Sequence, residues 1–142
     1  DRHEVSTTLR MEFYYNSSHI FLQNPIFGVG TGEFFKAYEK QVSGTGQVKT
    51  KNPHNQYLLT GVETGMIGIL ALLYLFFTQW RISRVFYDKE RLLAQGMLLT
   101  IMIGCFFNSS LADHPESTFY LLMSALFFSQ RGTRRKETLL NS

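Results

Sequence analysis

Apolar residues are concentrated in the second half of the chain, in three runs separated by short polar segments. Residues 58–80 contain one charged residue and would form a helix about 35 Å long, enough to cross a bilayer. Residues 92–108 would span about 25 Å, which is short unless the helix continues through Leu111. The third run, residues 118–129, approaches spanning length if its helix begins at Pro115. The pattern predicts an all-α, polytopic integral membrane protein with about three membrane helices.

The first 57 residues are more polar and are predicted to form a helical loop region. Between residues 9 and 23 the apolar positions recur at helical spacing. Asn24-Pro25 should end that helix, because the residue before a proline avoids the helical conformation. A short helix is predicted over residues 34–42. The run Gly-Val-Gly-Thr-Gly at residues 28–32 predicts a tight turn with positive φ angles, and a nucleotide-binding loop is the alternative.

Three segments follow from this reading. Residues 1–57 form the helix and loop region, residues 58–130 hold the membrane helices, and residues 131–142 form a basic tail. The chain opens without a basic, cleavable leader, so no signal peptide is expected and the sequence fits the interior of a longer membrane protein. Within residues 58–80, Gly61 and Gly65 form a small-xxx-small pair that would allow another helix to approach closely.

Charge indicates the orientation of the helices. Four Lys and Arg residues lie in residues 81–91, read as a charged connector, and four in residues 131–142, whereas the polar connector around Asp113 has none. The positive-inside rule therefore places the connector and the tail in the cytoplasm and residues 1–57 on the periplasmic side. The net charge of +3 is not organised as a basic stripe with interleaved aromatic residues, so no nucleic-acid partner is predicted. The single cysteine excludes an internal disulfide.

The segment that offers chemistry is Lys-Asn-Pro-His-Asn-Gln-Tyr-Leu at residues 51–58. Histidine accepts a proton near neutral pH, so His54 is the candidate base. Composition alone favours the other interpretation, a polar loop histidine without a role. Arg10 could hold a diphosphate with two parallel hydrogen bonds, or it could be an interfacial arginine with its stem along the lipid.

Acidic residues give further candidates. Glu63 lies inside the first apolar run. A carboxylate there is either part of a functional site or a structural residue that reaches the interface or pairs with another helix. Asp113, His114 and Glu116 could be combined with His54 in a metal site, but their spacing matches no standard ligand pattern. No metal and no other cofactor are therefore predicted.

Three segments carry a family resemblance. Asn-Pro-His-Asn-x-Tyr-Leu at residues 52–58, followed by Glu-x-Gly at residues 63–65, resembles the signature loop of the O-antigen ligase and polymerase superfamily. Residues 9–34, from Leu-Arg-x-Glu-Phe-Tyr to the glycine run, are similar to the segment that precedes the large periplasmic loop of this family. Residues 108–116 resemble the last periplasmic turn of its ligase-type members. These proteins are bacterial membrane glycosyltransferases that use polyprenyl-diphosphate-linked glycans.

The resemblance implies a reaction and roles for residues. An undecaprenyl-diphosphate-linked glycan would be transferred, with inversion, to a hydroxyl of lipid A–core at the periplasmic face of the bacterial inner membrane. His54 would deprotonate or orient that hydroxyl, and Arg10 would bind the diphosphate. Supporting or substrate-binding positions would be Asn52, Asn55, Tyr57 and Glu63, with Asp113 and Glu116 as further candidates.

Alternatives within and outside the superfamily remain. O-antigen or exopolysaccharide polymerases and protein O-oligosaccharyltransferases share the loop and differ in the acceptor. A non-catalytic membrane segment, for example of a transporter, is the alternative from another class. Superfamily members carry many more membrane helices upstream, including another phosphate-binding arginine, so these 142 residues alone are expected to be inactive.

Overall fold

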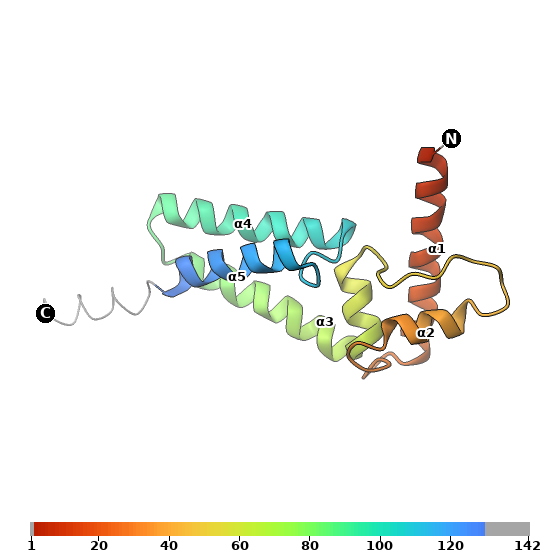
Figure 1. Cartoon of the computed structure of the whole chain (residues 1–142). Coiled ribbons are helices and arrows are strands. Elements are labelled where there is room, and N and C mark those ends of the chain that lie inside the picture. The colour runs from red at the N-terminus through yellow and green to blue at the C-terminus, as the bar shows by residue number, and fades with distance from the viewer. Residues whose placement is uncertain (1, 130–142) are drawn as a thin grey trace, which may run out of the picture.

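The computed structural model describes the backbone of residues 2–129 and the side chains of residues 7–129. The described part contains five α-helices and no strand (Figure 1), which confirms the all-α prediction. They are α1 (Arg2–Gln23), α2 (Phe34–Gln41), α3 (Gln56–Ser83), α4 (Asp88–Phe107) and α5 (His114–Ser129). The predicted basic tail, residues 131–142, lies outside the described residues.

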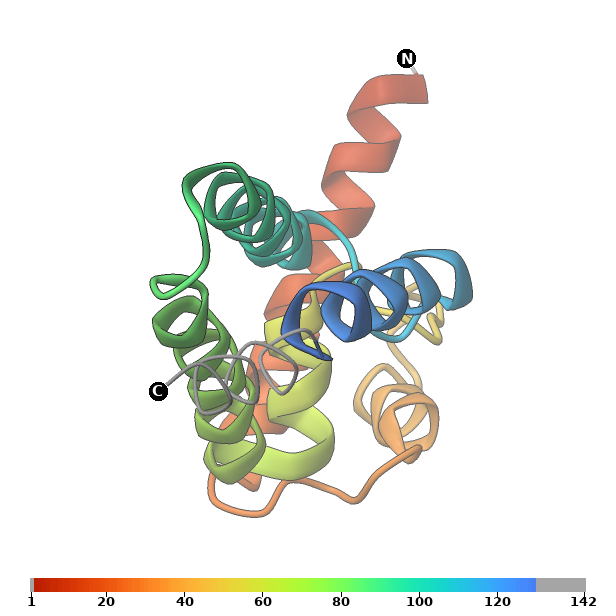
Figure 2. The same cartoon turned by 90° about the vertical axis from the view of Figure 1, so that its left-hand side faces the viewer.

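The helices form two regions that meet at α3. The second part of α3 packs with α4 and α5 around the buried residues Phe76, Leu98 and Tyr120. The first part of α3 packs with α1 and α2 around a second core that includes Phe34 and Val62. α1 runs crosswise to the three-helix bundle (Figures 1 and 2), so its side faces the end of the bundle. The three-helix part is the bundle, and the part formed by α1, α2 and the first part of α3 is the outer region.

Two helices, α3 and α4, are long and apolar enough to cross a membrane. In the most apolar 18-residue stretch of each helix, only 17% of α3 and 22% of α4 is buried, whereas the core helix of a soluble protein would be mostly buried. Large apolar side chains such as Tyr74, Phe77 and Leu93 point outward instead. The third predicted span, α5, begins one residue before Pro115, and its 16 described residues are too few to cross a bilayer.

The connector predicted at residues 81–91 is shorter than its charges suggested. α3 continues through Ser83 and α4 begins at Asp88, so the connecting segment is only residues 84–87. Arg81 lies in the last turn of α3, and Lys89 and Arg91 lie in the first turn of α4. Arg, Lys and Glu are good helix formers, and acidic residues such as Asp88 favour a helix N-terminus. The charges therefore mark the end of the apolar stretch and not the end of the helix.

Gly65 breaks α3, which the sequence had predicted as one continuous span. Its φ and ψ angles are 68° and −160°, outside the helical region. In a continuous helix, the Val62 carbonyl would accept the hydrogen bond of the Met66 N–H. Here the Val62 carbonyl accepts from the N–H of Val29 (2.8 Å), and the Met66 N–H donates to the Pro25 carbonyl (2.8 Å). Backbone groups of Pro25 and Val29 thus replace the helical hydrogen-bond partners of Met66 and Val62, and these two bonds fix the kink.

The glycines have separate structural roles. Gly28, Gly30 and Gly32 all have positive φ angles, which confirms the predicted turn. A side chain on Gly28 would meet the backbone of Glu63 at 2.5 Å, so this glycine allows turn and helix to touch. Gly61 lies against the ring of Phe21 in α1, in agreement with its predicted close helix approach, whereas Gly65 serves the kink.

We expect Gly28→Ala to destabilise the fold much more than Gly32→Ala. Both positions have positive φ, so each alanine carries a conformational cost of roughly 1–3 kcal/mol. Gly32 has no atom within 4 Å of an added Cβ, so only Gly28→Ala adds a collision with the α3 backbone. Thermal unfolding of both variants of the full-length protein measures the difference. Equal losses of stability would show that the turn does not need to contact the kink.

Candidate functional site

The loop before α3 holds His54 in an uncommon backbone conformation. His54 has a φ of 55° and is the one non-glycine residue with positive φ in the described part of the chain. The Asn52 Oδ1 atom accepts the His54 N–H at 2.8 Å, across the buried Pro53, and Thr50 Oγ1 donates to the Asn52 carbonyl. This local turn explains how the conformation is held. Residues in such conformations are concentrated at functional sites.

The turn between α4 and α5 is hydrogen bonded to the same loop. Ser109 is fully buried, and its hydroxyl donates to Asn52 Oδ1 at 2.6 Å. The Gln56 Oε1 atom accepts the N–H of Leu111 at 3.0 Å. Two hydrogen bonds therefore connect the His54 loop with a segment more than 50 residues later in the sequence.

The C-terminal end of α4 supplies another anchor. The Phe106 carbonyl accepts from the Tyr14 hydroxyl (3.2 Å) and from Asn55 Nδ2 (3.1 Å). The Tyr14 hydroxyl is also 3.2 Å from the His54 carbonyl, so its single proton is shared between two acceptors. These contacts join α1, the His54 loop and α4 at one point.

The imidazole ring of His54 remains half-exposed. One of its faces lies against Phe13 of α1, with ring centroids 6.3 Å apart and an interplanar angle of 28°. Neither ring nitrogen is hydrogen bonded to any of residues 7–129, so both are available to a substrate. The backbone is fixed while the ring is open, as a positioned base requires.

The predicted supporting residues divide into two groups. Asn52, Asn55 and Tyr57 lie in or next to the loop, and their side chains form hydrogen bonds with backbone groups or with Ser109, and none with the imidazole. Asn55 caps α3 by accepting the Leu58 N–H at 3.0 Å. Tyr57 donates to the Met102 carbonyl at 3.0 Å. A substrate-binding role for the asparagines stays a prediction.

The acidic candidates lie elsewhere. Glu63 follows the start of α3 by about two turns, and its carbonyl accepts the Gly30 N–H at 2.9 Å beside the glycine turn. Asp113 accepts from Asn108 Nδ2 at 3.0 Å in the α4–α5 turn, and Glu116 lies in the first turn of α5. No contact of these three carboxylates with His54 occurs among residues 7–129. These carboxylates therefore lie in segments next to the His54 loop and make no direct contact with the imidazole.

Arg10 is exposed and lies on the same face of α1 as the residues that contact His54. It precedes Phe13 by three positions and Tyr14 by four, and such residues are neighbours on a helix surface. None of the described side chains forms an ion pair with Arg10. The guanidinium is thus one helical turn from the His54 contacts and is free to bind an anion.

Sequence reasoning did not identify Phe13, Tyr14, Gln56 and Ser109 as parts of the site. Phe13 and Tyr14 follow Arg10 at helical spacing, and this was the available signal. Ser109 lies in the segment that resembles the last periplasmic turn of ligase-type members, but no local pattern indicated its contact with Asn52, which spans 57 residues. Among the side chains of residues 7–129, no group of three His, Cys, Asp or Glu residues is close enough to hold a metal ion.

We expect Ser109→Ala to slow the reaction at the loop about fivefold while substrate affinity changes little, because one hydrogen bond of about 1 kcal/mol holding Asn52 is lost. Ser110→Ala is the matched control, since Ser110 is also buried and its hydroxyl makes no hydrogen bond to the described loop. Single-turnover rate and binding affinity of both variants decide the outcome. Similar rates in the two variants would remove Ser109 from the support of His54.

A family comparison covers the outer region and the kink. The family model described as O-antigen ligase matches residues 1–73, which include Arg10, the glycine turn, the His54 loop and Gly65. Comparison with curated proteins and with solved structures gives no match. Because the matched segment is just over half of the 142 residues, the chain belongs to the O-antigen ligase family.

Proposed function

We propose that this chain forms part of the reaction centre of a membrane glycosyltransferase. The donor is a glycan linked to undecaprenyl diphosphate, and the acceptor is a hydroxyl group of lipid A–core. The observation that carries the proposal is the His54 loop, whose backbone is held by hydrogen bonds to Asn52 and Tyr14 while the imidazole stays open. Membership of the O-antigen ligase family supports the same reaction class.

His54 acts as the general base. One ring nitrogen takes the proton of the acceptor hydroxyl as its oxygen attacks the anomeric carbon from the face opposite the diphosphate. The bond between that carbon and the diphosphate oxygen breaks, and its electron pair leaves with undecaprenyl diphosphate. Attack from the opposite face inverts the configuration at the anomeric carbon.

Arg10 binds the leaving diphosphate. Its guanidinium is exposed, carries no ion pair among the described side chains and lies one turn from Tyr14, so a diphosphate can reach it from the His54 side. A planar guanidinium forms parallel hydrogen bonds with phosphate oxygens and remains charged at all relevant pH values. It therefore stabilises the charge that develops on the departing group.

The test is glycan transfer by the full-length protein, reconstituted with a lipid-linked donor and with lipid A–core as acceptor. We expect transfer with inversion, and we expect it to continue in excess chelator because the proposed chemistry uses only His54 and Arg10. Transfer only to a second donor glycan or only to a protein would overturn the proposed acceptor. Activity that vanished in chelator and returned with Mn²⁺ or Mg²⁺ would overturn the mechanism.

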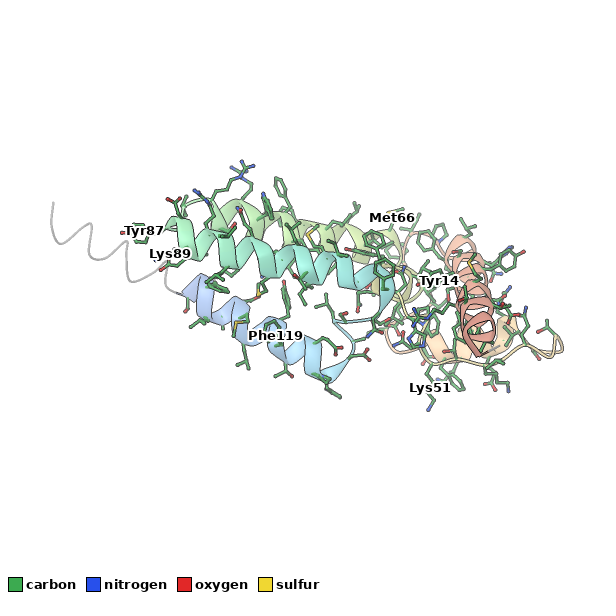
Figure 3. All side chains as sticks on the ribbon, turned by 90° about the horizontal axis from the view of Figure 1, so that it is seen from above. Tyr14, Lys51, Met66, Tyr87, Lys89 and Phe119 are labelled. Atoms are coloured by element: carbon green, nitrogen blue, oxygen red, sulfur yellow. The ribbon has the colours of Figure 1, made fainter. Side chains whose placement is uncertain are left out.

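The proposed orientation gives a separate prediction. The bundle axis lies along the membrane normal, with the outer region in the periplasm and the α3–α4 turn in the cytoplasm. Figure 3 shows Tyr14 and Lys51 at one end of the molecule and Tyr87 and Lys89 at the other. Cysteines at the exposed positions Ser43 and Lys89 report the two sides, and Ser83 is unsuitable because it is buried. An impermeant thiol reagent added outside should label Ser43→Cys and not Lys89→Cys, and the reverse pattern would contradict this orientation.

A further inference from the structure

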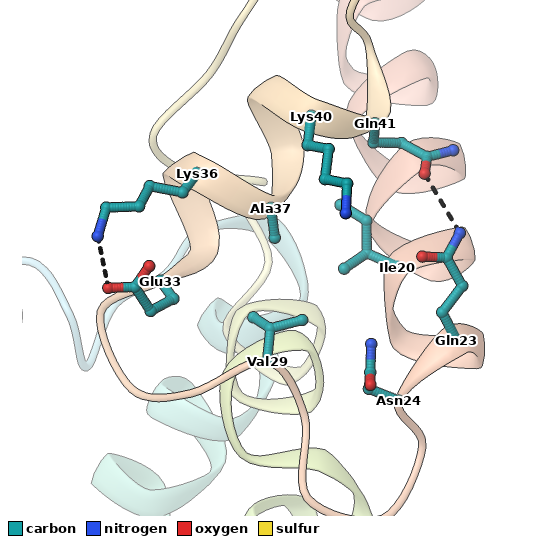
Figure 4. A pocket seen from close by; sticks show the side chains of 9 residues that line it. All are labelled: Ile20, Gln23, Asn24, Val29, Glu33, Lys36, Ala37, Lys40 and Gln41. Atoms are coloured by element: carbon teal, nitrogen blue, oxygen red, sulfur yellow. Dashed lines mark hydrogen bonds and ion pairs between the residues drawn. The ribbon is translucent and has the colours of Figure 1, made fainter.

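A cavity of about 470 Å³ lies in the outer region, between the end of α1, the glycine turn and α2 (Figure 4). Its volume is within the range of small-molecule sites. Ile20, Val29 and Ala37 give it an apolar base, and amide and charged side chains surround them. It contains no residue of the His54 loop, so it is a separate feature of the same region.

One cation faces this cavity without an acidic partner. Glu33 is paired with Lys36 at 2.9 Å, and Glu39 is paired with Lys49 at 2.6 Å. Lys40 forms no ion pair with any described side chain. In Figure 4 the ammonium end of Lys40 points toward Ile20, whereas Lys36 points away toward Glu33. The uncompensated charge of Lys40 therefore favours an anionic group in the cavity.

The amide side chains add neutral hydrogen-bonding groups. Gln23 donates to the Gln41 Oε1 atom at 3.4 Å, which leaves the Gln23 carbonyl oxygen and the Gln41 amino group to a ligand. The side chain of Asn24 is hydrogen bonded to none of the described residues. Amides offer both donors and acceptors, as hydroxyl groups do, and the apolar base suits the C–H face of a sugar ring.

The cavity and the reaction centre share one face of α1. Ile20 and Gln23 follow Phe13 by seven and ten positions, which is about 10–15 Å along the helix. Asn16 lies between them and donates to the Tyr38 hydroxyl at 3.2 Å, which fixes α2 against α1. Burial raises the pKa of Tyr38, although the hydrogen bond from Asn16 lowers it in part, so this phenol stays neutral. The cavity thus lies within a few sugar units of the reaction centre, and a glycan that reacts at His54 has to pass around α2, which covers the α1 face between them.

We infer that this cavity is a subsite for a sugar unit that carries a phosphate or a carboxylate. This unit lies a few sugars along the glycan from the sugar that reacts at His54. The inference rests on the proposed glycosyl transfer. Lys40 binds the anionic group, and the amides of Gln23, Asn24 and Gln41 bind hydroxyl groups of the ring.

Sugar binding to the full-length protein in detergent tests the inference without requiring transfer. Glucose 6-phosphate, glucuronic acid and glucose are the probes, measured by saturation-transfer NMR titration. Either anionic sugar or both should bind roughly five- to tenfold more tightly than glucose at low salt, with a smaller difference at high salt. Comparing the two anionic probes tells phosphate from carboxylate.

Variants identify the residues responsible. Lys40→Gln should remove the preference for anionic sugars, and Lys36→Gln should weaken it less, because Lys36 points away from the cavity and its loss only leaves Glu33 unpaired. Equal effects of the two substitutions, or an unchanged preference in Lys40→Gln, would overturn the inference. Inorganic phosphate that bound as tightly as glucose 6-phosphate would overturn the role of the sugar ring.

Sugar binding in the cavity and glycan transfer at His54 are tested independently of each other. His54→Ala should bind the probes like the wild type, since His54 does not line the cavity. Glycan transfer without any binding of the probes would refute the subsite and keep the proposed function. Selective probe binding by a full-length protein that transfers no glycan would refute the proposed function and keep an anionic-sugar site.

Discussion

His54→Ala is expected to reduce the single-turnover rate of glycan transfer by about 10²–10⁴-fold, which is the usual contribution of a positioned base. The affinity for the lipid-linked donor should stay close to the wild-type value, because the imidazole acts on the acceptor hydroxyl. Rate and donor affinity are measured on the full-length protein after its folding has been checked. A rate close to that of the wild type would exclude His54 as the base.

The backbone of His54 calls for a second variant. Alanine tolerates the positive φ of this position less well than histidine or asparagine does, so His54→Ala also disturbs the loop. His54→Asn keeps the left-handed conformation but cannot accept the proton. The single-turnover rate should fall in both variants, and only His54→Ala should also be less stable. His19→Ala is the control, since His19 is exposed on α1 and lies against Tyr15.

Arg10→Ala is expected to weaken binding of the diphosphate donor by about a hundredfold or more. Hydrogen bonds to charged groups contribute roughly 1.5–3 kcal/mol, and Arg10 would form two of them with the diphosphate. Arg10→Lys keeps the charge but loses the planar pair of donors, so it should recover only part of the affinity and rate. Donor titration and single-turnover rate distinguish the two variants.

A matched control separates binding by Arg10 from general attraction. Lys51→Gln removes the same charge from the same region, where Lys51 lies over the ring of Phe35 at 5.6 Å. Its effect on donor affinity should be small and should fade with salt. Equal losses in Arg10→Ala and Lys51→Gln would mean that only the net charge matters. Unchanged affinity in Arg10→Ala would remove the arginine from the diphosphate site.

Local patterns allowed most helices of this chain to be predicted. Apolar spacing and Asn24-Pro25 located the end of α1, and the long apolar run located α3. Gly65 could not be recognised as a break, because its conformation depends on hydrogen bonds from the turn some 35–40 residues earlier. The charged residues near Arg81 and Lys89 were misread, because charge ends an apolar stretch without ending a helix.

The site was predictable only in part. The residues of the loop pointed to His54 once the family resemblance was added, whereas composition alone favoured a histidine without a role. The supports came from distant segments, with Tyr14 40 positions before His54 and Ser109 57 positions after Asn52. Periodicity describes neighbours along one element, so it carries no information about such pairs.

The kink at Gly65 also sets the depth of the reaction centre in the proposed membrane orientation. A straight α3 of 28 residues would be about 42 Å long, more than the hydrocarbon thickness of about 30 Å, and would lift His54 far above the lipid phosphates. Residues 66–83 alone span about 27 Å, and the first part of α3 runs crosswise to the bundle (Figure 1). The break thus relieves hydrophobic mismatch and keeps the histidine level with the headgroups, where a diphosphate anchored by its lipid chain has to stay.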